Sequence, residues 1–269
     1  MSKRAIITLV ALMLSIVSTS TSALANKETD DLLQSWRMEL RFTPYKPKIS
    51  QNATKQAFYD LMYGDSEPVM TTFATHHYLW KGFGLLGVGA SVGYWKTTGK
   101  TRLCSDADGN YIQCYGQGLD AIAASSTEGN SNTQLMIIPL SLEVAYRIDY
   151  LNREWSVPLD FYAKLGIDYH FWWATTEGEI ATSTREEEDG TSNTINGSGG
   201  TPGLNGSVGV MLDLSFLEPM TATRARKNGI AASYLFFEWN WAQGDGFKQP
   251  NRLDMSSSGW TLGLGMDFL

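Results

Sequence analysis

The chain has 269 residues, a formal net charge of −7 at pH 7 and an aromatic share of 12%. A net negative charge repels a phosphate backbone, so we expect no nucleic-acid partner. The 26 glycines and the many aromatic residues favour β-structure over a helical bundle.

Residues 1–25 have the layout of a cleavable secretory signal. Lys3 and Arg4 precede an apolar run over residues 5–17, and small residues lead up to Ala25. The apolar run is short for a membrane-spanning helix, which needs roughly 20 residues. Cleavage before Asn26 removes two cations and takes the formal charge from −7 to −9. We therefore expect an exported protein with a single domain over residues 26–269.

Eight segments of the exported chain alternate apolar and polar residues with a period of two. The clearest is residues 136–148, where one face is apolar and the other carries Glu143 and Arg147. The least clear is residues 69–80, because both of its faces mix the two kinds of side chain. Each segment predicts a strand with one apolar and one polar face. The predicted strands cover residues 36–42, 69–80, 86–94, 136–148, 159–173, 208–216, 235–241 and 260–268.

The connections between these strands alternate in length. Short connections are expected at residues 81–84, around Asn152, and at 218–229, where Pro219 and Gly229 mark the start and end of a short helix. Long polar connections are expected at residues 44–67, 98–132, 174–203 and 242–257. The pattern predicts an all-β, eight-stranded, antiparallel up-and-down barrel with short turns at one end and long loops at the other.

The apolar face of such a barrel can point outward to lipid or inward to a soluble core. Two features favour a transmembrane barrel. The apolar runs match the roughly 9 to 11 residues with which a tilted strand crosses a bilayer. Aromatic residues also gather at both ends of the strands, as they do at the two interfaces of a membrane. The predicted aromatic girdle contains Trp36, Phe42, Tyr94, Tyr146, Trp173, Trp239, Trp241, Trp260 and Phe268.

The polar face combines small residues with charges of both signs. The interior of an eight-stranded barrel is just wide enough for side chains, and buried charges must pair there. We therefore expect a polar plug of ion pairs in place of an open channel. The predicted lumen network contains Arg37, Glu39, Arg41, Glu143, Arg147, Lys164, Asp168, His170 and Glu238.

Several stretches resemble small outer-membrane β-barrels of Gram-negative bacteria, and more closely an uncharacterised eight-stranded family of them. They are "MELRFTPYKPKIS", "FGLLGVGASVGYW", "IIPLSLEVAYRIDYL" and "YLFFEWNWAQGDGF" with the terminal strand. The resemblance implies a place in the cell outer membrane, contact with its lipid and lipopolysaccharide, and recognition of the C-terminal strand by barrel-assembly machinery. The family supplies no established activity or cofactor. Such barrels usually end on an aromatic residue, whereas here Leu269 follows Phe268.

Two cysteines suit an oxidising compartment with one disulfide. Cys104 and Cys114 flank a turn centred on Gly109, so a hairpin would place them opposite each other at the tip of a loop. The same stretch begins like a calcium loop, with Asp106, Asp108 and Asn110. Its sixth and twelfth positions are Tyr111 and Gln117, where such a loop needs Gly and Glu. A plain turn is the favoured interpretation, and no metal site is expected.

Catalytic residues are not expected. His170 lies two residues from Asp168 on one strand face, which could form a base with an orienting carboxylate, but no GxSxG motif accompanies them. His76 and His77 are interpreted as strand filler because neighbours point to opposite faces. We expect a non-enzymatic barrel with a structural or surface-interaction role, or with passage of small solutes through a narrow pore. The alternatives are a lipid-modifying outer-membrane enzyme and a soluble lipocalin-like ligand-binding barrel.

Overall fold

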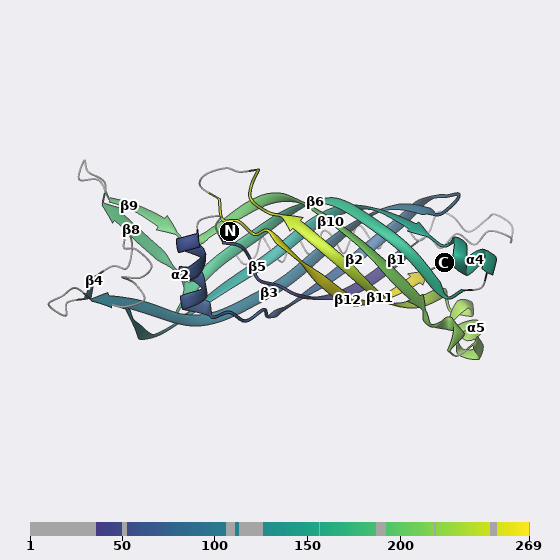
Figure 1. The fold of residues 1–269 in the computed structure, drawn as a ribbon, viewed down its shortest axis with the longest axis horizontal. Coiled ribbons are helices and arrows are strands. Elements are labelled where there is room, and N and C mark those ends of the chain that lie inside the picture. The colour runs from purple at the N-terminus through teal and green to yellow at the C-terminus, as the bar shows by residue number, and fades with distance from the viewer. Residues whose placement is uncertain are drawn as a thin grey trace. The chain divides into compact units, whose positions relative to one another are not determined.

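The computed structural model describes residues 36–49, 53–105, 111–112, 126–155, 157–186, 192–217, 219–247 and 252–268. The expected signal at residues 1–25 lies outside these ranges, as do Cys114 and Leu269. Within them, eight long strands form a closed antiparallel barrel (Figure 1). They are β1 (Trp36–Pro44), β2 (Val69–Lys81), β3 (Leu85–Ser105), β5 (Ser126–Ile148), β6 (Leu159–Thr176), β10 (Ser198–Asp213), β11 (Ile230–Gln243) and β12 (Ser257–Phe268).

Each strand pairs with its neighbour in the chain, apart from short additional strands. The β6–β10 ladder joins two long strands across the short strands between them, and the β12–β1 ladder joins the last strand to the first and completes the ring. The short strands are β4 (Tyr111–Ile112), β7 (Glu179–Ile180), β8 (Thr182–Glu186) and β9 (Ser192–Asn196). β4 and β7 extend the sheet, whereas β8 and β9 form a separate hairpin. The predicted eight-stranded antiparallel barrel is confirmed.

Three strands extend well beyond the predicted bounds: β3, β5 and β10, which begins at Ser198 and not at the predicted residue 208. The prediction of a loop over residues 98–132 was wrong. β3 and β5 stay paired within this range, for example through Thr98 with Gln134 and Gly99 with Thr133. These residues are polar on both faces, so hydropathy does not alternate along them. Threonine nevertheless fits a pleated sheet well. The hairpin therefore projects past the apolar part of the barrel.

The helices lie at the two ends of the barrel. α5 (Pro219–Lys227), which follows the short η1 turn (Leu214–Phe216), confirms the helix predicted between Pro219 and Gly229. α4 (Tyr150–Trp155) replaces the simple turn expected around Asn152, and α2 (Ala53–Tyr63) lies in the expected 44–67 loop. Figure 1 shows α4 and α5 at one end, which we call the short-turn end, and α2 and β4 at the other, the long-loop end. None of the helices that the structure describes is long and apolar enough to cross a membrane.

The barrel is apolar outside and polar inside. On β6, Leu165 and Ile167 are 62% and 57% exposed, whereas their neighbour Lys164 is only 3% exposed. Exposed large apolar side chains occur in the same alternation on all eight long strands. This arrangement is the reverse of a soluble domain, where large apolar side chains are the ones most often buried.

Buried apolar side chains form two clusters inside the barrel. At the long-loop end, Tyr45 meets Trp95 with ring centroids 5.4 Å apart, and the Tyr45 hydroxyl donates to the Met255 carbonyl at 3.0 Å. We call this cluster the aromatic cap; it contains Tyr45, Tyr59, Trp95, Leu135, Ile137 and Met255. A second cluster lies among the charged side chains of the lumen and contains Tyr162, Met211, Ala232, Tyr234 and Phe236.

Candidate functional site

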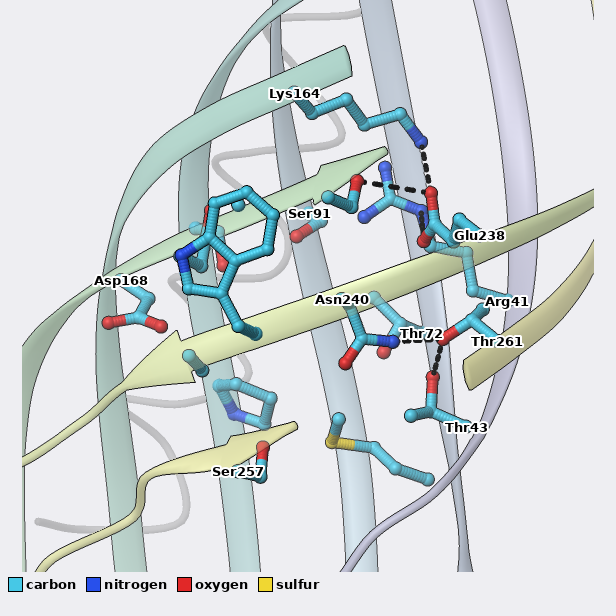
Figure 2. A pocket seen from close by; sticks show the side chains of 18 of the residues that line it. Arg41, Thr43, Thr72, Ser91, Lys164, Asp168, Glu238, Asn240, Ser257 and Thr261 are labelled. Carbon is cyan, nitrogen blue, oxygen red and sulfur yellow. Dashed lines mark hydrogen bonds and ion pairs between the residues drawn. The ribbon is translucent and has the colours of Figure 1, made fainter. Parts of the chain in front are cut away.

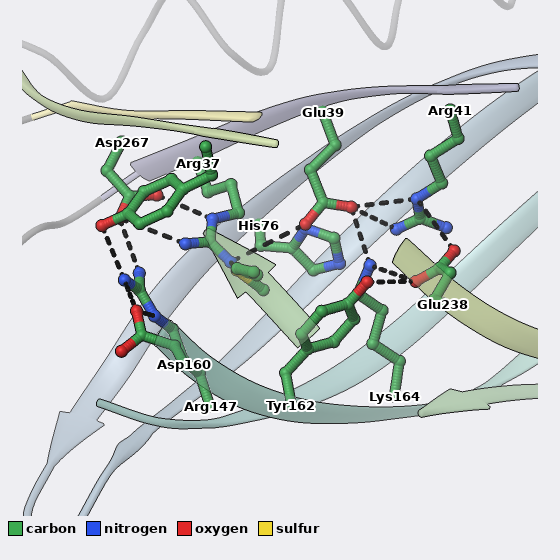
Figure 3. A network of polar contacts seen from close by, with 12 residues as sticks. Arg37, Glu39, Arg41, His76, Arg147, Asp160, Tyr162, Lys164, Glu238 and Asp267 are labelled. Carbon is green, nitrogen blue, oxygen red and sulfur yellow. Dashed lines mark hydrogen bonds and ion pairs between the residues drawn. The ribbon is translucent and has the colours of Figure 1, made fainter. Parts of the chain in front are cut away.

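The polar lumen contains two groups of buried ion pairs (Figure 3). The turn-side ion cluster consists of Arg37, Arg147, Asp160 and Asp267. Arg37 Nε and Arg147 Nη1 each donate to Asp267 at 2.7 Å, and Arg147 Nε donates to Asp160 at 2.9 Å. The register explains the first contact, since Arg37 and Asp267 are direct cross-strand partners in the β1–β12 ladder. Two cations and two carboxylates leave this group without net charge.

The second group, the mid-barrel ion cluster, consists of Glu39, Arg41, Glu143, Lys164 and Glu238. Arg41 binds Glu143 through two hydrogen bonds of 3.0 and 2.9 Å. Lys164 Nζ lies 2.8 Å from Glu39 and 3.1 Å from Glu238. Three carboxylates face two cations, so this group carries an excess negative charge.

Four further side chains complete the mid-barrel ion cluster. His76 Nε2 lies 3.1 Å from Glu143, and Tyr162 donates to Glu238 at 2.8 Å. Ser91 donates to Glu143 and Ser207 to Glu238, both at 3.2 Å. Such hydrogen bonds offset the desolvation cost that buried charges incur.

Small residues make room for these long side chains. A Cβ at Gly89 would collide with the His76 ring. The interpretation of His76 and His77 as strand filler, and not as a ligand pair, rested on their pointing to opposite faces, but it did not anticipate the contacts of His76 in the lumen. His76 and His77 do lie on opposite faces, but His76 is 1% exposed and contacts a carboxylate.

Asp168 and His170 lie outside both ion clusters. They line a cavity of about 90 Å³ between the mid-barrel ion cluster and the aromatic cap (Figure 2). Asp168 is hydrogen-bonded by the Asn205 side chain, and His170 is hydrogen-bonded to the backbone of Thr201. Asp168 Oδ1 and His170 Nδ1 lie 3.9 Å apart, and neither atom has a hydrogen-bond partner.

The other lining residues of the cavity are mostly neutral and polar. Figure 2 shows Thr43, Thr72, Asn240, Ser257 and Thr261 around it. The cavity is closed towards α2 by the aromatic cap, whose tyrosines are neutral, because burial raises the pKa of the Tyr45 and Tyr59 hydroxyls. Among the described residues, no hydrogen bond links His170 to a serine hydroxyl. The pair therefore lacks the contact between a base and a nucleophile that acyl transfer requires.

The residues of the expected aromatic girdle lie on the outward face at both ends. At the long-loop end, Trp239 and Trp260 are cross-strand partners, 52% and 47% exposed. At the short-turn end, Trp36 and Phe268 are cross-strand partners. The remaining members are Phe42, Tyr94, Tyr146, Trp173 and Trp241, each exposed or partly exposed.

The expected disulfide lies largely outside the described residues. Cys104 is in β3, and its backbone partner in the β3–β4 hairpin is Ile112, two residues short of Cys114. The register therefore differs from the one expected, whereas the disulfide itself stays a prediction. The residues of the calcium-like turn, 106–110, also lie outside the described ranges.

Sequence reasoning missed five lumen residues that make these contacts: His76, Asp160, Tyr162, Tyr234 and Asp267. The available signal was their position, since each occupies a polar-face position of its strand. Tyr234 is an example, because its hydroxyl accepts from Arg147 at 2.6 Å and its ring lies 4.4 Å below the same guanidinium.

Comparison with known proteins gives a distant likeness in fold. No protein-family model matches the chain, and no curated protein matches it. The structure of Neisserial surface protein A is 9% identical with a TM-score of 0.40, covering 88% of this chain and 98% of that one. Ail of Yersinia pestis, solved with the heparin analogue sucrose octasulfate, is 11% identical with a TM-score of 0.34, covering 87% and 97%. A major outer membrane protein from Thermus thermophilus is 14% identical with a TM-score of 0.37, covering 87% and 99%.

Proposed function

We propose that this chain is an outer-membrane β-barrel with a closed lumen and a structural or surface-interaction role. The apolar outer face supports the membrane location. Monomeric soluble proteins rarely expose contiguous apolar patches of more than a few hundred Å², yet here every long strand presents such side chains outward. A closed barrel also pairs its backbone groups between strands, as a membrane requires.

The filled lumen is the observation that carries the proposed closure. The apolar cluster around Tyr234 and Phe236 fills the space between the two ion clusters, since Arg37 and Arg147 stack on Tyr234 and Lys164 lies over Phe236. Arg37, Glu39 and Lys164 are each at most 3% exposed. An eight-stranded barrel has an interior just wide enough for side chains, and here they occupy it.

The orientation follows from the two ends. β1 begins and β12 ends at the short-turn end, which outer-membrane barrels keep on the periplasmic side. The long-loop end would then face outward, with the β3–β5 hairpin and the β8–β9 hairpin available to other surfaces. Outer-membrane lipid and lipopolysaccharide would contact the sides, and β12 would present the C-terminal signal to barrel-assembly machinery.

Two measurements test the proposal. Membrane fractionation with heat-dependent gel mobility should place a folded barrel in the outer membrane. Recovery in the soluble periplasmic fraction would instead favour the ligand-binding barrel.

Planar-bilayer recording of the purified barrel should show no stepwise current. Defined single-channel steps in the wild type would contradict a closed lumen and favour passage of small solutes. A porin added afterwards to the same bilayer serves as the positive control for membrane insertion.

The enzymatic alternative has less support. Asp168 and His170 share a cavity, but their geometry provides no nucleophile within hydrogen-bond reach of His170 among the described residues. We expect a His170→Ala strain to keep its phospholipid and lipid A composition. A changed lipid composition in this strain would support a lipid-modifying activity of the barrel.

A further inference from the structure

We propose that the cavity beside Asp168 and His170 is a binding site for a small organic cation with an ammonium group. The cation would enter between β1 and β12 near Thr43 and Thr261, where the ladder of the two strands ends; we call this place the seam. This site goes beyond the proposed function and does not depend on it, since a barrel can bind such a ligand whether or not its lumen conducts.

The charged residues around the cavity favour a cationic ligand. Arg41 and Lys164 are the two cations that line it, and both are already bound to carboxylates of the mid-barrel ion cluster. Asp168 is a third acidic side chain at this cavity, beside Glu143 and Glu238. Among the described residues, no arginine or lysine forms an ion pair with Asp168; its charged-group contact is His170, at 3.9 Å.

The unpartnered atoms are acceptors that border the cavity. The side chains of Asp168 and His170 are 3% and 4% exposed, and Asp168 Oδ1 and His170 Nδ1 have no hydrogen-bond partner. Figure 2 shows Asp168 away from the dashed contacts that join Lys164 to Glu238. A buried acceptor without a donor costs about 1–3 kcal/mol. A ligand that donates to both atoms would remove that cost.

The spacing of the two acceptors suits an ammonium nitrogen better than a metal ion. A nitrogen about 2.8 Å from both atoms would see them at an angle of roughly 90°, within reach of two N–H donors. A zinc ion with bonds of about 2.0–2.1 Å would need an O–Zn–N angle of roughly 145° to span 3.9 Å, far from tetrahedral. The cavity therefore favours a hydrogen-bonding cation.

The seam between β1 and β12 offers a route to this cavity. The β1–β12 ladder stops at Phe42 and Leu262, although β1 continues to Pro44 and β12 starts at Ser257. Pro44 has no amide hydrogen to donate across the seam. Beyond the last pair, the hydroxyls of Thr43 and Thr261 hold the strands together at 2.6 Å.

A second cavity, of about 70 Å³, lies at the outer end of the seam. It is lined by residues that include Lys46, Glu67 and Trp260, and it shares Asn240 and Ser257 with the first cavity. Lys46 is balanced by Asp60 at 2.9 Å and by Asp65, so its charge does not repel an incoming cation. The shared residues place the two cavities next to each other, which makes the strand pair β1–β12 the proposed route from the outer rim towards Asp168.

The cavity volume limits the ligand to a small molecule. One water-sized centre needs about 10–15 Å³ of such space, so a cavity of about 90 Å³ holds a ligand of roughly six to nine non-hydrogen atoms. A short primary amine meets the size, the charge and the donor requirement together.

Titration calorimetry of the full purified barrel with ethylammonium chloride tests the site. We expect saturable binding, with ethanol and tetramethylammonium chloride bound at least about 10-fold more weakly, because one lacks the charge and the other lacks N–H donors. Absence of ethylammonium binding, or equal binding of tetramethylammonium, would overturn the proposal. Neither result would bear on the closed lumen, which conductance tests separately.

Asp168→Asn should weaken ethylammonium binding by about 10- to 100-fold, the effect of removing a charged acceptor. Heat-dependent gel mobility checks that this variant is folded. The matched control is Glu179→Gln, an exposed carboxylate of β7 that lines neither cavity and should leave the affinity unchanged. If both variants bind ethylammonium like the wild type, Asp168 does not hold the cation.

The route has its own test. In a Thr43→Cys/Thr261→Cys variant, oxidation should cross-link the seam and slow ethylammonium entry at least about 10-fold, and reduction should restore it. Each single-cysteine variant is the control. Equal entry rates in the oxidised and reduced double variant would show that the ligand enters elsewhere.

Discussion

Asp267 holds the two arginines of the turn-side ion cluster together. It is fully buried and accepts from Arg37 and Arg147, which themselves stack on the Tyr234 ring from 4.9 and 4.4 Å. Without its charge, Arg147 would keep Asp160, and among the described carboxylates Arg37 would keep only the longer contact to Glu39 at 3.8 Å. Removing one partner of a buried ion group leaves an uncompensated charge, which is the costly case.

We therefore expect Asp267→Asn to lower the free energy of unfolding by about 3–5 kcal/mol. Glu143→Gln should cost less, about 1–3 kcal/mol, because the mid-barrel ion cluster has one carboxylate in excess. Urea unfolding in lipid vesicles, followed by gel mobility, measures both. Asp65→Asn at the exposed loop is the neutral control. An Asp267→Asn barrel as stable as wild type would contradict the assigned role.

At the scale of elements, periodicity predicted the strands but not their partners. The alternation in β5 and β6 follows from the two-residue period of a strand, so both were found. The contact from Arg147 to Asp160 depends on the shear between strands, which no single strand encodes. Trp95 and Ile137 were also missed, because they are apolar residues on the polar face, where the lumen gives way to the aromatic cap.

We expect the aromatic cap to hold residues 44–67 in a fixed conformation at the long-loop end. Trp95 is 1% exposed and donates to the Pro68 carbonyl at 3.0 Å. Trp95→Ala should therefore cost about 3–5 kcal/mol locally and make residues 44–67 susceptible to trypsin. Trp239→Ala, on the outward face, should leave that segment resistant. Equal cleavage of the two variants would mean that the cap does not fix the segment.

The terminal strand carries a separate prediction about assembly. Phe268 pairs with Trp36 at the short-turn end, so it occupies the terminal aromatic position of the barrel even though Leu269 follows. Phe268→Ala should reduce the amount of folded barrel in the outer membrane, whereas deletion of Leu269 should leave it unchanged. Heat-dependent mobility of membrane fractions measures both. The reverse ranking would assign the signal to Leu269.

At the scale of the whole molecule, stability resides in the interior charges as well as in the lipid-facing surface. Buried ion pairs are screened far less by salt than exposed ones. We expect the urea midpoint in uncharged lipid vesicles to change little between about 0.05 and 1 M NaCl. A large fall with salt would place the stabilising pairs on the exposed loops, of which Lys46 with Asp65 is an example. Lys46→Ala is the variant that separates the two cases.

The Arg37–Asp267 contact joins residues 230 positions apart in the chain. It can form only when the last strand meets the first, because the two strands that carry it are the ones that complete the ring. The contact therefore reports closure of the barrel. A chain stalled before that event would leave charged side chains of β1 and β12 unpaired, and this penalty works against a stable open sheet as an end product.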